Sequence, residues 1–292
     1  MESVQASVAD NDEQFEPCPT PLSWQDVLRQ FGEQSQRWSV TVNEAEVHGR
    51  TIGEGPPLVF VNGLMGDLHL QSLTVWVLKE EFRCVLFDWP SKLPQTSPAA
   101  LADYVTSVAN EHAGDQFSIF STGAGCMAAL HVMQRYPDRI RKAILHGAFA
   151  KCDLSFPERL AARFGSFLPG TLGWLPGVVR ILQQNHRPWF PPFDQSRWSF
   201  AEANLSSTPI SRLSRLSLML KQFDFTADLE SLKTPLMLVR CEGDSPLQSS
   251  AQDQLEAKLP HAEVEWLHTC GRLAFLTHPH RLKKIVKSFL EA

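Results

Sequence analysis

The sequence predicts an α/β protein with a mostly parallel β-sheet and helices on both of its faces. Short continuous apolar runs recur along the chain, and such runs indicate strands that are covered on both faces. Helix-like stretches separate these runs, as is typical of the connections between parallel strands. The chain has 292 residues, of which 43% are hydrophobic. It is therefore long enough to bury the core of one large domain or two small ones.

The first half of the chain shows this alternation. Residues 1–20 are acidic and polar and are predicted to be disordered. After them, the sequence predicts a hairpin over 39–42 and 46–52 and strands over 58–61 and 84–87. A helix over 99–111, a strand over 117–120, a helix over 126–136 and a strand over 143–145 follow.

Residues 150–230 break the alternation with many Pro, Phe and Trp residues between short helical runs. We interpret them as a helical cap inserted over one end of the sheet. The alternation then resumes with a strand over 234–241, a helix near 250–259, a strand over 262–267 and a closing helix over 280–290. These patterns predict a single domain over 21–292.

Charge and cysteine content narrow the range of functions. The net charge of −5 argues against a nucleic-acid partner. The six cysteines are scattered without a C-x-x-C pair, which favours free thiols in a reducing compartment over disulfides or a zinc site. The N-terminal residues have no apolar signal core, and no run of 18 apolar residues occurs. We therefore expect a cytoplasmic protein without a transmembrane segment, metal or cofactor.

Five stretches in order carry a family resemblance. They are P-P-L-V-F-V-N-G-L-M-G, R-C-V-L-F-D-W-P, C-M-A-A-L-H-V-M-Q-R-Y-P-D-R-I-R-K-A-I-L, T-P-L-M-L-V-R-C-E-G-D-S-P and R-L-A-F-L-T-H-P. Over residues 38–292 this order resembles the α/β-hydrolase fold superfamily of the AB hydrolase-1 type. S-R-L-S-L-M-L-K-Q, G-D-S-P-L-Q-S-S and H-T-C-G-R-L-A-F-L are similar to maspardin-like proteins of this fold.

The resemblance implies a catalytic triad that this sequence lacks in intact form. The family places its nucleophile at the apex of a G-x-S-x-G elbow, and on residues 121–125 that apex is Gly123, which has no side chain. The histidine position falls on Arg272, which stays protonated and cannot act as a base. The acid position falls on Ser245, or on Asp244 with a shift of one residue. The triad is thus degenerate.

Displaced groups remain as alternatives. With a shifted register Ser121 or Thr122 could be the nucleophile, and Cys126 could be one too, but a strand end and a buried thiol are the simpler interpretations of Ser121 and Cys126. His146 or His268 could be the base, and of these we expect His146 at the edge of the pocket. Arg272 could form an ion pair with Asp244 or bind an acidic ligand.

The oxyanion-type donors and the cap suggest ligand binding. By the resemblance, the backbone N–H groups of Leu64 and Ala124 would still bind an anion or a carbonyl. The apolar stretch 165–182 could line a pocket, dock a protein, touch a membrane or simply pack as core.

Three functions follow from these observations. The first is a non-catalytic pseudo-hydrolase, an adaptor or binding protein for a protein partner or for a small apolar ligand under the cap. The second is an active hydrolase of ester-type bonds that uses displaced groups. The third is a non-hydrolytic acid/base enzyme of the same fold.

Overall fold

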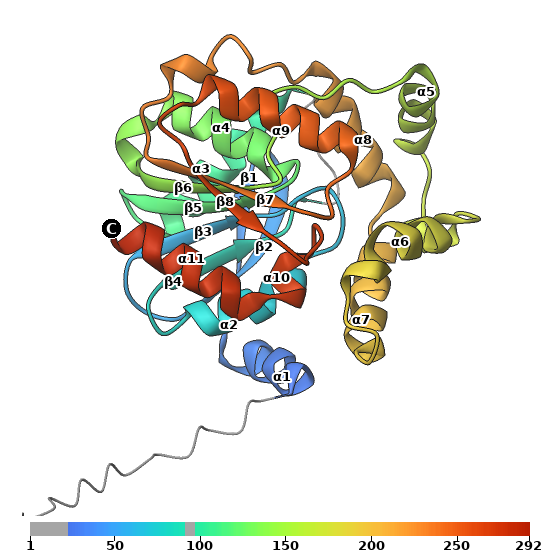
Figure 1. Ribbon diagram of the computed structural model, residues 1–292, viewed down its shortest axis with the longest axis horizontal. Coiled ribbons are helices and arrows are strands. Elements are labelled where there is room, and N and C mark those ends of the chain that lie inside the picture. Colours follow the sequence, from blue (N-terminus) through green and yellow to red (C-terminus); the bar gives the residue numbers. More distant parts are fainter. Residues whose placement is uncertain (1–22, 91–96) are drawn as a thin grey trace, which may run out of the picture.

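An eight-stranded sheet forms the centre of the molecule (Figure 1). The computed structural model describes residues 23–90 and 97–292. The strand order is β1-β2-β4-β3-β5-β6-β7-β8, in which β1, β2 and β4 pair antiparallel and all other neighbours pair parallel. The strands are β1 (Gln36–Val42), β2 (Ala45–Ile52), β3 (Pro57–Val61), β4 (Arg83–Phe87), β5 (Phe117–Thr122), β6 (Ile140–His146), β7 (Leu236–Cys241) and β8 (Glu263–Leu267).

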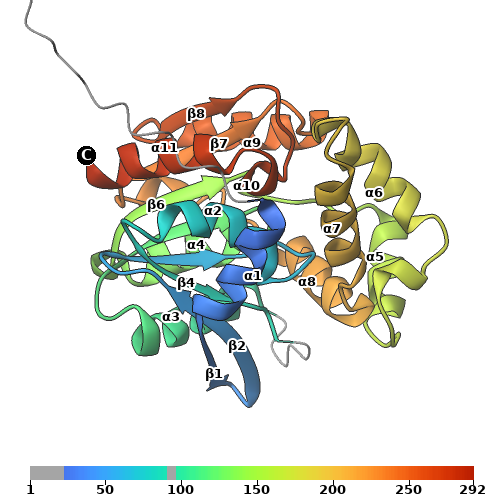
Figure 2. The ribbon, with the colours of Figure 1, turned by 90° about the horizontal axis from the view of Figure 1, so that it is seen from below.

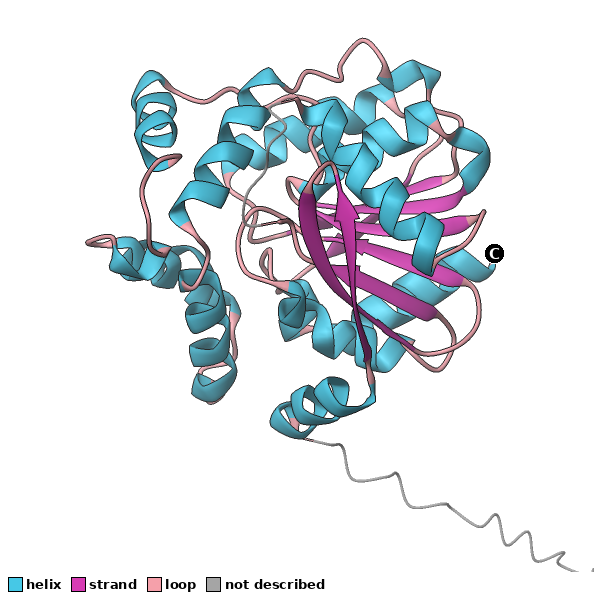
Figure 3. Cartoon of the chain, turned by 180° about the vertical axis from the view of Figure 1, so that it is seen from behind, coloured by secondary structure: helices cyan, strands magenta, loops and turns pink. Residues whose placement is uncertain are grey.

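Helices cover both faces of the sheet, so the predicted α/β class is confirmed (Figures 1 and 3). One face carries α3 (Leu101–His112), α4 (Gly125–Arg135), α8 (Ile210–Gln222) and α9 (Pro246–Lys258). The other carries α1 (Trp24–Gln34), α2 (Ser72–Leu78), α10 (Ala274–Thr277) and α11 (Pro279–Glu291). The remaining helices are α5 (Phe156–Gly165), α6 (Val178–His186) and α7 (Gln195–Ser206).

Strand β3 shows why the central runs are continuously apolar. Val59 and Val61 join the buried cluster on the α3–α4 face, whereas Leu58 and Phe60 join the cluster on the α2–α11 face. All four side chains are buried because successive residues of a strand point to opposite faces and both faces are covered. A parallel strand order of this kind leaves the carboxyl ends of the strands at one edge, where ligands bind in open α/β sheets.

Several element predictions were wrong. The helix expected near 250–259 begins four residues earlier, because Ser245 caps it by accepting a hydrogen bond from the Gln248 N–H and a proline occupies its first position. Helices α1, α2 and α10 had not been predicted. The disorder expected for residues 1–20 lies outside the described residues.

Helices α5 to α8 lie between β6 and β7, in the stretch expected as a cap. Figure 2 shows α5, α6 and α7 together at one side of the molecule, with α8 between them and the body. Below, residues 151–222 are called the cap segment. Within residues 23–90 and 97–292, no helix is both long and apolar enough to cross a membrane.

Candidate functional site

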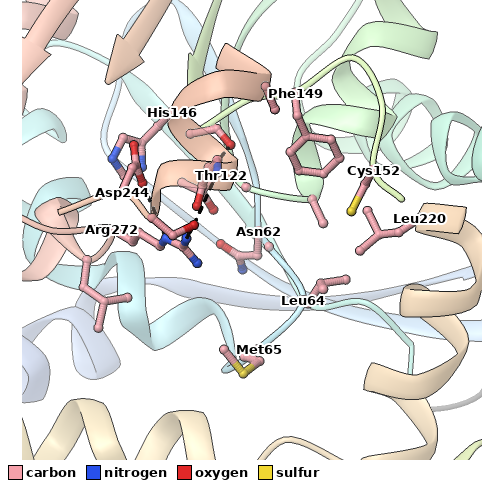
Figure 4. A pocket seen from close by; sticks show the side chains of 18 of the residues that line it. Asn62, Leu64, Met65, Thr122, His146, Phe149, Cys152, Leu220, Asp244 and Arg272 are labelled. Atoms are coloured by element: carbon pink, nitrogen blue, oxygen red, sulfur yellow. Dashed lines mark hydrogen bonds and ion pairs between the residues drawn. The ribbon is translucent and has the colours of Figure 1, made fainter. Parts of the chain in front are cut away.

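A cavity of about 560 Å³ opens at the carboxyl ends of β3, β5, β6 and β7. Its wall combines loops after these strands with cap residues such as His186, Leu205 and Leu220. Figure 4 shows polar side chains, among them His146, Asp244 and Arg272, on one side and apolar ones on the other. The volume is typical of a small-molecule site.

The strand-to-helix elbow is present, and the residue at its apex has no side chain. Gly123 follows β5 with φ +51°, and its N–H donates to the His146 carbonyl at 2.8 Å. A Cβ built on Gly123 would meet nothing within 4 Å, so the position faces open space in the cavity. Next to it, a Cβ on Gly125 would lie 2.5 Å from the Asn62 carbonyl oxygen. The backbone therefore has the shape of a nucleophile elbow but carries no reactive side chain at its apex.

Of the three displaced nucleophiles, Thr122 lines the cavity, whereas Ser121 and Cys126 do not reach it. Ser121 and Cys126 are both fully buried, and the Ser121 hydroxyl donates to the Cys126 Sγ at 3.2 Å. Burial raises the pKa of the Cys126 thiol to about 12, so the thiol stays protonated near neutral pH. Neither side chain is among those that line the cavity wall. The simpler interpretation, a packed strand end and a buried thiol, describes both.

Arg272 and Asp244 form the expected ion pair. The Arg272 Nε lies 3.4 Å from the Asp244 Oδ1, and the Arg272 guanidinium also donates to the Ser245 hydroxyl at 3.0 Å. Only 3% of the Asp244 side chain is exposed, against 42% for Arg272. The second Asp244 oxygen accepts from the Gln252 amide at 2.9 Å. The residues predicted for the acid and histidine positions, Asp244 or Ser245 and Arg272, therefore contact one another, and Ser245 also caps α9.

Two histidines face the cavity in their neutral form. His146 ends β6, and its Nε2 lies 3.1 Å from the Cys241 Sγ. Burial, reinforced by the Arg272 charge and opposed by Asp244, lowers the pKa of His146 to about 4. His186 in α6 has its pKa lowered to about 4 by the same two causes, burial and the Arg272 charge.

His268 lies elsewhere. It is exposed just beyond β8, where its ring stacks on Trp266 with centroids 6.3 Å apart. Its carbonyl accepts from the Arg281 guanidinium at 2.9 Å. His268 is not part of the cavity wall, so of the two candidate bases only His146 is placed at the site.

The two residues predicted to carry oxyanion-type donors both lie at the cavity. Leu64 follows β3, Ala124 immediately precedes α4, and both line the cavity. No described residue accepts a hydrogen bond from either backbone N–H. Ala124 stands at a helix N-terminus, where N–H groups have no intrahelical acceptor and the helix dipole favours an anionic or carbonyl oxygen.

Sequence reasoning missed part of the wall. Figure 4 shows Phe149, Cys152 and Leu220 opposite the polar side. His186 also lines the cavity and was missed as well. A signal existed for Phe149 and Cys152, which directly follow the β6 strand end, whereas Leu220 and His186 depend on how the cap helices pack.

The described residues present free thiols but no metal-binding cluster. Among residues 23–90 and 97–292, no cluster of three or more His, Cys, Asp or Glu side chains is placed to hold a metal ion. The five cysteines in this part of the chain are free thiols. Cys241 and Cys270 lie close together beneath the cavity, with their sulfurs 3.6 Å apart.

The strand order, the elbow and the cavity together define an α/β-hydrolase architecture. The alpha/beta hydrolase family model matches residues 58–285, and the chain belongs to this family. Among curated proteins, the chain is similar to a pimeloyl-[acyl-carrier protein] methyl ester esterase of Nitrosomonas europaea. The two are 22% identical over 247 residues, which cover 81% of this chain and 96% of the relative.

Solved structures agree on the fold. An esterase from Thermogutta terrifontis superposes with a TM-score of 0.75 at 16% identity, covering 88% of this chain and 98% of that chain. An enol-lactonase from Burkholderia xenovorans superposes with a TM-score of 0.72 at 17% identity, covering 87% and 100%. At these identities the likeness concerns the fold and not the reaction.

Proposed function

We propose that this chain is a binding protein of the α/β-hydrolase family that holds a small ligand beneath its cap without forming a covalent intermediate. The observation that carries the proposal is Gly123. The elbow keeps its left-handed apex and its open space, but the reacting atom is missing. A pseudo-hydrolase of this kind fits the maspardin-like similarity of the sequence.

The surrounding wall supports this proposal because it offers no substitute pair of nucleophile and base. Within the described residues, no hydroxyl or thiol of the wall is hydrogen-bonded to an imidazole; His146 is instead held against Cys241. Burial raises the pKa of the half-buried Cys152 thiol, which lowers its thiolate fraction at neutral pH. Nucleophilic catalysis needs such a pair within hydrogen-bond reach.

The wall indicates the chemistry of the ligand. One side presents the N–H groups of Leu64 and Ala124, which suit an ester or carbonyl oxygen. The opposite side presents Phe149, Cys152 and Leu220, which suit an alkyl or aryl body. The ion pair with Asp244 neutralises Arg272, which favours a neutral polar head over a free carboxylate. The ligand is therefore a small neutral molecule with one carbonyl-type head.

Two measurements test this function. Saturation-transfer NMR with methyl octanoate should show binding to the wild type, and the methyl resonance of the ester should remain unchanged over hours. Cys152→Phe, which fills the apolar side of the cavity, should abolish the transfer signal, whereas Tyr136→Phe on the body surface should not. Absence of binding in a folded wild type, or steady release of methanol, would overturn the proposal.

A second candidate function is hydrolysis or another acid/base reaction through His146. The observation that favours it is a neutral imidazole at the cavity wall, together with a curated relative named as an esterase. If this candidate holds, p-nitrophenyl butyrate is turned over by the wild type and His146→Gln removes most of the rate. Ser121→Ala should then leave the rate unchanged, because Ser121 is buried away from the cavity.

A further inference from the structure

Helix α5 exposes its large apolar side chains and buries its small ones. Phe156, Leu160 and Phe164 recur every four residues, so they share one helical stripe, and they are 70%, 43% and 68% exposed. The buried residues of α5 are Ala162 and Gly165 on the other side. A Cβ on Gly165 would collide with the Ser214 side chain of α8, so the small residues allow the close helix contact. Among residues 23–90 and 97–292, the apolar stripe of α5 is therefore left largely exposed rather than packed against another element.

Further exposed apolar side chains belong to α6 and to the segments that flank α5 and α6. We call the whole set the apolar cap surface; it comprises Phe156, Leu160, Phe164, Phe167, Leu168, Trp174, Ile181 and Phe193, all exposed. Phe167 is 87% exposed, Trp174 75% and Phe193 91%. These residues belong to α5, α6 and the segments beside them, and α5 and α6 form the outer edge of the molecule in Figures 1 and 2. Exposed apolar residues on this scale mark an interaction site.

The charge of the same segment is one-sided. From residue 156 to residue 193, the range of the apolar cap surface, the sequence has four arginines against one acidic residue, Glu158, although the whole chain has 32 acidic against 27 basic residues. Arg163 and Arg180 are exposed beside the apolar cap surface. The Arg159 guanidinium lies over the Phe156 ring, 5.9 Å from its centroid. A segment with this excess of arginine attracts an anionic partner, while the acidic remainder of the chain is repelled by it.

We propose that the apolar cap surface docks on the surface of an anionic lipid bilayer. Phe and Trp side chains would enter the boundary between headgroups and acyl chains, while Arg163 and Arg180 pair with lipid phosphates. A bilayer offers a broad apolar layer directly beneath a dense layer of negative charge. That combination matches large exposed aromatic residues interspersed with arginines over two helices and their loops. The proposal concerns the outer face of the cap and does not depend on what the cavity binds.

Vesicle flotation tests the proposal. Wild-type protein is mixed with phosphatidylcholine vesicles that contain 30 mol% phosphatidylglycerol and, in parallel, with pure phosphatidylcholine vesicles. The protein should float with the anionic vesicles, should float far less with the neutral ones, and should be released as salt rises. Phe164→Ser with Phe167→Ser should lower the partition coefficient about tenfold or more. Arg163→Gln with Arg180→Gln should lower it about fivefold for each arginine.

Matched changes on the body serve as controls. Tyr136→Ser removes an exposed aromatic residue and Arg141→Gln an exposed arginine, both outside the cap segment, and partitioning should not change. Circular dichroism establishes that each variant is folded. Three results would overturn the proposal: a wild type that stays in solution with anionic vesicles, binding that survives both cap variants, or a concentration-dependent dimer that the cap variants dissolve. The last result would assign the surface to a second copy of the chain.

Discussion

The two glycines of the elbow should respond very differently to the same substitution. Gly125 lies where β3 and α4 approach most closely, and a Cβ there would collide with the Val61 and Asn62 carbonyl oxygens, the second at 2.5 Å. Both neighbours are backbone atoms of a buried strand end, so neither can move aside cheaply. We expect Gly125→Ala to lower the free energy of unfolding by about 3 kcal/mol or more. That corresponds to a melting temperature lower by roughly 6–12 °C for a domain of this size.

Gly123→Ala adds the same methyl group to open space. Its cost is the strain of a side chain at φ +51°, about 1–2 kcal/mol, offset in part by about 0.4–1 kcal/mol from the stiffer unfolded chain. The melting temperature should therefore fall by roughly 6 °C or less. Thermal unfolding followed by circular dichroism compares the two variants. Equal losses, or a larger loss for Gly123→Ala, would refute the view that the apex faces an empty cavity.

Further predictions concern the charged and titrating groups. Asp244→Asn removes a buried carboxylate that holds Arg272 and should lower the free energy of unfolding by about 1–3 kcal/mol. Asp103→Asn, in an exposed ion pair, should lower it by about 0.5 kcal/mol or less. Similar losses for the two variants in urea unfolding would argue against the buried pair. The pKa values of His146 and His186 are lowered to about 4 in the folded protein. As the pH falls, both histidines are therefore protonated in the unfolded chain before they are protonated in the folded protein. Their contribution to the free energy of unfolding is fully present above about pH 6.5 and is lost as the pH falls toward 4. Burial raises the pKa of Asp88 to about 6, so this carboxyl group adds to the free energy of unfolding as the pH falls over the same range. One group acting in this direction is outweighed by the two histidines. Urea unfolding at pH 7, 6 and 5 should show a declining free energy of unfolding and a smaller decline in His186→Asn; an equal decline in both proteins would contradict this assignment.

Much of the architecture was predictable because it rests on local patterns. Continuously apolar runs such as Leu58–Val61 predicted strands buried on both faces, and the structure has β3 and its neighbours in that state. The early start of α9 could also have been predicted, because a serine followed by proline at 245–246 is a helix-start signal. Helix α2 is harder to predict from the sequence. Five of its seven residues are buried, so it shows no amphipathic period.

The site was predictable only where one side chain decides the chemistry. A glycine at position 123 has no side chain that could act as a nucleophile there, and the pairing of Arg272 with Asp244 followed from opposite charges on two loops that the fold brings together. The sequence could not show that Ser121 and Cys126 turn away from the cavity or that His146 faces Cys241. Those contacts depend on side-chain directions at strand ends. The exposure of Phe167 and Trp174 was equally out of reach, because an apolar stretch is usually core.

The most direct test of the central claim is the intact mass of the wild-type protein after incubation with a fluorophosphonate probe. A serine esterase treated in parallel is the positive control, and Gly123→Ser with Arg272→His shows whether restoring two of the missing groups changes the outcome. The empty apex predicts that the wild-type mass does not change while the control protein gains one probe. A single stoichiometric adduct on a cavity residue of the wild type would show that this site carries a working nucleophile and would contradict the account.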